Sequence, residues 1–139
     1  MVCIVALAVA AGLAIAACGK SDEEKATDKA CAARDDIQKQ VNELSNLTLA
    51  TATLDGIKSN LDEIQKDVGQ IKDAEGQLNE QRKQEFQKAT DTFESQVQST
   101  IKSLGSSTSI SAAKPQLESS LRQLSTSYQQ TLAPINCGS

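Results

Sequence analysis

The sequence predicts an all-α protein, folded as an antiparallel up-and-down four-helix bundle with coiled-coil-like packing. Large apolar residues recur every three or four positions along most of the chain after its first apolar run, which is the period of an amphipathic helix. Short polar stretches rich in cap and turn residues divide this pattern into four segments. Four amphipathic helices joined by short connections pack with chain neighbours antiparallel.

The composition excludes several kinds of site. The chain of 139 residues has no His, so imidazole catalysis and His-ligated metal sites are impossible. A net charge of −4 and a pI near 4.8 argue against binding to nucleic acid, which requires a basic surface. The sequence has no phosphate-binding loop and no calcium-loop spacing. We therefore expect no enzyme activity, no cofactor and no metal.

Residues 1–17 predict a signal peptide. Gly12 alone falls outside the apolar set in this run, which is short for a membrane span. No Lys or Arg precedes the run, so we expect the true start of the protein to lie further upstream. The alternative is an uncleaved membrane anchor.

The end of the apolar run resembles the bacterial lipobox, an aliphatic residue and two small residues before a Cys. The residues that match are Ile15, Ala16, Ala17 and Cys18. The resemblance implies cleavage before Cys18, whose Sγ then carries diacylglycerol and anchors the protein to the outer face of the cell membrane. Residues 18–30 would be the lipidated Cys and a polar tether. The alternative is cleavage after Ala16, which would release a soluble secreted protein.

The remaining cysteines predict a disulfide. Cys3 lies in the signal peptide and Cys18 in the lipobox, which leaves Cys31 and Cys137 near the two ends of the helical domain, residues 31–137. Two Cys residues usually pair in the oxidising compartment outside the cytoplasm. Two free thiols are the alternative, and a catalytic Cys is not expected without a His partner.

A capping box marks the start of the first predicted helix, and a seam of apolar residues marks the second. Ser21 and Glu24 fit a capping box at the start of a helix over about 21–44. The second helix carries a seam of apolar residues spaced alternately by three and four, the pattern of left-handed helix packing. The seam residues are Leu54, Ile57, Leu61, Ile64, Val68 and Ile71.

The seam loses its phase near Gly76, so we expect the helix to break there and a third helix to begin around Leu78. The alternative is one helix over 51–104, which would make the fold a long-helix hairpin. The fourth helix is expected over about 110–133, with Pro115 in its first turn and Pro134 ending it. This topology places Cys31 and Cys137 at the same pole of the bundle.

Several of these features recur in a known group of proteins. They are the run Cys31–Ile37 (CAARDDI), the turn at Asn46 and Leu47, Gly76, Tyr128 and Cys137. Their order resembles small bacterial exported lipoproteins of actinobacterial type with a Cys-bracketed helical domain. The resemblance implies export and this topology, and no activity is assigned to that group.

The function that these observations favour is that of a lipid-anchored extracytoplasmic domain, structural or engaged in protein–protein contacts in the cell envelope. Its partner would be an envelope protein or further copies of the chain. The alternative is a carrier that binds an apolar or lipid ligand between its helices. Paired carboxylates such as Asp62 and Glu63 are expected on solvated helix faces rather than in a catalytic cleft.

Overall fold

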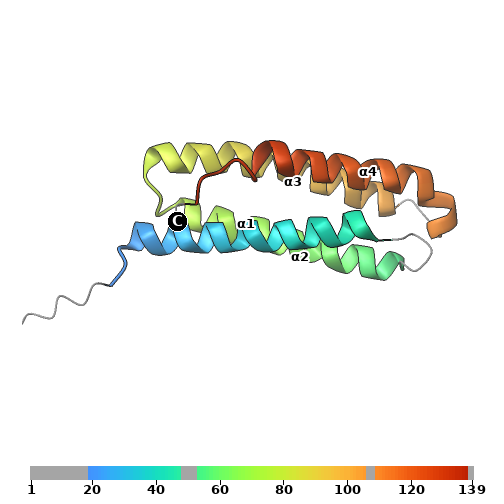
Figure 1. Ribbon diagram of the computed structural model, residues 1–139, viewed down its shortest axis with the longest axis horizontal. Coiled ribbons are helices and arrows are strands. Elements are labelled where there is room, and N and C mark those ends of the chain that lie inside the picture. The colour runs from blue at the N-terminus through green and yellow to red at the C-terminus, as the bar shows by residue number, and fades with distance from the viewer. Residues whose placement is uncertain (1–18, 48–52, 106–108, 138–139) are drawn as a thin grey trace, which may run out of the picture.

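Four antiparallel helices make up the part of the chain that the structure describes (Figure 1). The computed structural model describes residues 19–47, 53–105 and 109–137, and these contain no strand. The helices are α1 (Asp22–Asn46), α2 (Leu54–Glu75), α3 (Glu80–Gly105) and α4 (Ile110–Thr131). The predicted all-α four-helix bundle is confirmed.

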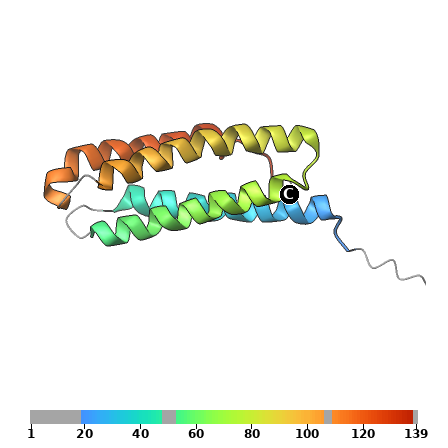
Figure 2. The ribbon, with the colours of Figure 1, turned by 180° about the vertical axis from the view of Figure 1, so that it is seen from behind.

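The bundle consists of two helical hairpins packed against each other. Helix α1 pairs with α2 and α3 pairs with α4, while contacts of α2 with α3 and of α1 with α4 join the two hairpins. Seen from behind, the hairpins form a rod in which α2 and α3 run antiparallel and are joined by a turn at one end (Figure 2). Each helix therefore contributes one apolar face to a single shared core.

The core is built from aliphatic side chains with two phenylalanines and one tyrosine. Burying each large side chain stabilises the fold by about 1.5–3 kcal/mol relative to leaving it exposed. The largest fully buried residues are Tyr128, Phe86, Phe93, Ile37, Leu44, Ile57, Leu61, Ile64, Ile71, Leu104, Leu117 and Leu124.

Helix α1 begins at the predicted capping box. The Ser21 hydroxyl accepts a hydrogen bond from the Glu24 N–H at 3.1 Å, and the Glu24 carboxylate accepts one from the Ser21 N–H at 2.8 Å. Two backbone donors that no helix carbonyl could reach are thereby satisfied. Acidic residues in the first turn also interact favourably with the positive end of the helix dipole.

The predicted break between the second and third helices is present, and the long-helix alternative is wrong. Helix α2 ends at Glu75, and the N–H groups of Gln77 and Leu78 turn back to bond the carbonyls of Ala74 and Glu75. The next helix begins at Glu80, two positions later than expected, because the Asn79 side chain caps it by accepting from the Arg82 N–H at 3.0 Å. Leu78 is buried beneath this turn.

The expected position of Pro115 in the first helical turn is wrong. Helix α4 begins at Ile110, which places Pro115 in its second turn. The helix continues because proline there removes only one intrahelical bond, and its exposed ring lies on the solvent side. The helix also ends at Thr131, ahead of the expected 133, where the N–H groups of Leu132 and Ala133 both bond the Tyr128 carbonyl.

Candidate functional site

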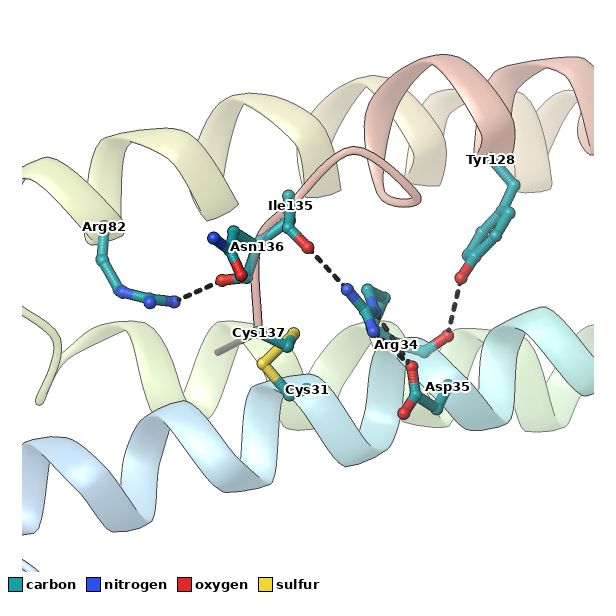
Figure 3. Close-up of a disulfide and its surroundings, with 8 residues drawn as sticks. All are labelled: Cys31, Arg34, Asp35, Arg82, Tyr128, Ile135, Asn136 and Cys137. Carbon is teal, nitrogen blue, oxygen red and sulfur yellow. Dashed lines mark hydrogen bonds and ion pairs between the residues drawn. A yellow bond between two sulfur atoms is a disulfide. The ribbon is translucent and has the colours of Figure 1, made fainter. Parts of the chain in front are cut away.

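A disulfide joins α1 to the end of the described chain, near the pole of the bundle at which α1 begins (Figures 1 and 3). Cys31 on α1 and Cys137, which follows α4, form an S–S bond of 2.04 Å across a sequence separation of 106 residues. The predicted pairing is therefore present. The start of α1 and the turn between α2 and α3 lie at the same pole, where the Asn79 amide donates to the Glu23 carboxylate at 2.5 Å.

The segment from Leu132 to Cys137, here called the C-terminal strap, crosses from α4 to α1 (Figure 3). Arg34 of α1 donates to the Ile135 carbonyl at 2.6 Å, and Arg82 of α3 donates to the Asn136 carbonyl at 2.8 Å. Leu132 and Ile135 are buried. The strap is thus fixed by two arginines, two apolar side chains and the disulfide, so that it joins three helices.

Tyr128 connects the strap region to the core. Its ring is 1% exposed and meets the Phe93 ring edge-on, with centroids 5.9 Å apart. Its hydroxyl donates to the Arg34 carbonyl at 3.2 Å. Burial raises the pKa of this hydroxyl above its usual value. Tyr128 is consequently a packing residue that also anchors α4 to α1.

The predicted lipidation site lies outside the described residues. Cys18 and the preceding Ile15, Ala16 and Ala17 precede the part of the chain that the structure describes, which begins at residue 19. Within the described ranges, no helix combines the length and the apolar character needed to cross a bilayer.

Five of the six predicted seam residues are buried. Ile57, Leu61, Ile64, Val68 and Ile71 are at most 2% exposed. Leu54 is only partly buried, because it is the first residue of α2 and packs at the edge of the core.

Two buried carboxyl groups escaped the sequence analysis. Asp67 and Glu75 are 9% and 6% exposed, respectively, and both lie on α2. Burial is the main cause that raises the pKa of each group, and the charge of Asp36 adds to it for Asp67, as that of Asp91 does for Glu75. The sequence does hold a signal for Glu75, which lies four positions after Ile71 and three before Leu78 and so continues the seam spacing. Asp67 lies off the seam, and its burial depends on the neighbouring helices.

Among the described residues, no three Cys, Asp or Glu side chains gather in a way that could hold a metal ion. The paired carboxylates Asp62 and Glu63 are exposed, as expected of a solvated face.

Two hollows in the described surface differ sharply in chemistry. A groove of about 540 Å³ runs between α3 and α4 and is lined by nine polar side chains, of which Arg122 alone is charged. A smaller hollow of about 290 Å³ between α1 and α2 is lined almost wholly by charged residues, with more carboxylates than lysines. Neither hollow has the apolar lining that binding of a lipid would need.

Comparison with known proteins identifies no relative. No protein-family model, no characterised protein and no solved structure matches the chain.

Proposed function

We propose that the protein is a lipid-anchored extracytoplasmic helical domain that is held to the outer face of the cell membrane by Cys18 and acts in the cell envelope through contacts of its surface. The observation that carries this proposal is the position of the disulfide pole. Helix α1 begins at Asp22, four positions after Cys18, and the strap returns the other end of the chain to the same pole. An anchor at Cys18 would leave the rest of the rod free to project from the membrane.

The dimensions of the bundle support a projecting role. A helix of 25 residues, the length of α1, spans about 38 Å at 1.5 Å per residue. Helices α1 and α3 end, and α2 and α4 begin, at the pole opposite the disulfide (Figure 1). A partner would thus meet the far pole or the long faces of the rod.

The disulfide supports an oxidising location. Disulfides persist in exported proteins and are rare in the cytoplasm. Cys31 is 8% exposed, so the bond lies at the edge of the core rather than on an open loop. These features fit export, which the lipobox-like sequence at Ile15 to Cys18 independently predicts.

The filled interior supports surface contacts over carriage of a ligand. The faces of all four helices that meet inside the bundle are occupied by the protein's own aliphatic and aromatic side chains. A carrier would have to part the helices and expose this core, at a cost of about 25 cal/mol for each Å² of apolar surface.

Membrane fractionation of the native host tests the anchor. The wild-type protein and a Cys3→Ala variant should sediment with membranes and dissolve only in detergent, whereas Cys18→Ala should appear in the soluble fraction. Each substitution removes one thiol, and only Cys18→Ala removes the proposed lipid attachment. Persistence of Cys18→Ala in the membrane pellet would refute the anchor.

The intact mass of the detergent-extracted protein gives a second readout. It should correspond to a chain that begins at Cys18 with acyl chains attached, and it should rise by two hydrogens on reduction. A mass that begins at Ala17 without lipid would indicate a soluble secreted protein instead. A further bound lipid that co-purifies in native conditions would favour the carrier.

A further inference from the structure

The groove between α3 and α4 is lined by polar side chains, of which only Arg122 is charged. Residues 123–137 contain no charged side chain at all. The groove is lined instead by hydroxyl and amide groups from both helices, among them Thr92 and Gln96 of α3 and Gln123 and Gln130 of α4. Its volume of about 540 Å³ falls in the range of ligand sites, which runs from about 300 to 1,000 Å³.

Arg122 is the one charged side chain among the residues that line this groove. It makes no ion pair with any described residue. Its Nε donates to the Glu118 carbonyl of its own helix at 3.4 Å, so the terminal nitrogens keep their donors free. A guanidinium in this state can bind a carboxylate or a phosphate through two parallel hydrogen bonds.

The polar groups around Arg122 offer both donors and acceptors. The hydroxyls of Thr92 and Thr131 donate to carbonyls of their own helices at 2.9 and 2.7 Å, which leaves their oxygens as acceptors. The amides of Gln96, Gln123 and Gln130 make no hydrogen bond to any described group and can donate as well as accept. This combination matches the hydroxyl groups of a sugar or another polyol.

We infer that the groove between α3 and α4 binds a hydroxyl-rich polymer that carries isolated negative charges, with its anionic group on Arg122 and its hydroxyls on the surrounding amides and hydroxyls. The hollow between α1 and α2 would repel such a polymer, because it holds Asp36, Glu43, Glu63 and Asp67 against two lysines. The bound chain would therefore lie on one long face of the rod. The inference rests on the proposed function only in assuming that the bundle faces the polymers of the envelope.

An NMR titration of the full-length protein in nonionic detergent at low salt tests this site. The probe is a hyaluronan hexasaccharide, in which carboxylated sugars alternate with neutral ones that bear amides. Chemical shifts should move around Arg122, Gln130 and Thr92 and not on α1 or α2. Arg122→Gln should raise the Kd about tenfold, since one charge-assisted contact is lost.

Matched controls separate charge at the groove from charge in general. Lys58→Gln removes the same charge from the exposed face of α2 and should leave the Kd unchanged. The neutral chitohexaose should bind about tenfold more weakly than the hyaluronan probe, because it lacks the carboxylates. A glycerol phosphate oligomer distinguishes the source of the charge: tighter binding with the same dependence on Arg122 would identify phosphate as the anion.

Three outcomes would overturn the inference: no shifts in the groove at millimolar concentrations of either anionic probe, equal binding of the neutral sugar, or an unchanged Kd for Arg122→Gln. The titration does not involve the anchor, so its failure leaves the fractionation result intact. Conversely, a Cys18→Ala variant that stays in the membrane pellet would refute the anchor without altering the groove.

Discussion

Arg34 and Ile135 are joined across 101 positions of the sequence by a hydrogen bond of 2.6 Å from the Arg34 Nη1 to the Ile135 carbonyl. The backbone carbonyl of Arg34 also accepts the hydroxyl of Tyr128. One residue of α1 therefore holds both the last turns of α4 and the C-terminal strap. Its side chain is only 17% exposed, so water competes weakly for these contacts.

Arg34→Met should lower the free energy of unfolding by about 1.5–3 kcal/mol, the range for a lost hydrogen bond to a charged group. The substitution keeps an apolar stem but leaves the Ile135 carbonyl without its donor. Thermal unfolding followed by circular dichroism measures the effect. Arg122→Met, which removes an exposed guanidinium from α4, should change the free energy by less than about 0.5 kcal/mol. Equal Tm values for the two variants would contradict the role given to Arg34.

Loss of the disulfide should lower stability strongly while leaving the helices intact. A double substitution, Cys31→Ser with Cys137→Ser, removes a cross-link over a separation of 106 residues. In the chain-entropy model this costs about 4–5 kcal/mol, which for a domain of this size lowers the Tm on the order of 20 °C. Helicity at low temperature should stay near that of the wild type. Reductant should lower the Tm of the wild type and leave that of the double variant unchanged. A lower Tm of the double variant in reductant would show that reductant acts on something other than this disulfide.

Leu61→Asp should unfold the bundle, because it places a carboxylate at a fully buried position in the middle of the α2 seam. The milder Leu61→Ala should cost about 2–5 kcal/mol through the cavity that it leaves. Ser59→Asp adds the same charge on the exposed side of the same helix and should be tolerated. Circular dichroism spectra and melts distinguish the three variants. A native-like melt for Leu61→Asp would show that Leu61 does not lie in the core.

Glu75→Gln should stabilise the protein at neutral pH and not in acid. Burial and the charge of Asp91 raise the pKa of Glu75 in the folded state, while Lys72 and Lys83 partly offset this effect. The protonated form is thus favoured by folding. The stability that this raised pKa contributes is fully present below pH 4.5, the ordinary pKa of the group. It is lost as the pH rises through the pKa of Glu75 in the folded state.

Melts of Glu75→Gln and the wild type at pH 4 and pH 7 measure this dependence. The Tm of the variant should exceed that of the wild type by a few degrees at the higher pH and match it at the lower one. Glu85→Gln, on the exposed surface of α3, should show no such difference between the two conditions. An equal gain at both values of pH would show that titration of Glu75 is not the cause.

Local sequence signals predicted most of the fold. The three-and-four spacing of Ile57, Leu61 and Ile64 identified a buried face because a helix brings such positions to one side. Ser21 and Glu24 marked the start of α1 because their side chains satisfy backbone groups within the same turn. The disulfide followed from counting cysteines together with the up-and-down topology.

Other features depended on neighbouring helices and could not be predicted. Asp67 lies off the seam and has the polarity of a surface residue, yet packing of the bundle excludes water from it. Pro115 lies in the second turn because α4 begins at Ile110, the expected start, and the prediction that it lies in the first turn rested only on its missing N–H. The contacts of Arg34 and Arg82 with the strap join residues that no local pattern relates.

The sequence by itself determined that the chain forms four amphipathic helices, where they break and which two cysteines remain to pair, because periodicity, caps and composition act within a few residues. Only the tertiary structure decided which acidic residues are buried, that two arginines hold the strap, and that a nearly uncharged groove with a single arginine lies between α3 and α4. These properties arise from the approach of residues that are far apart in the chain, and hydrophobic burial brings them together without regard to their distance in sequence.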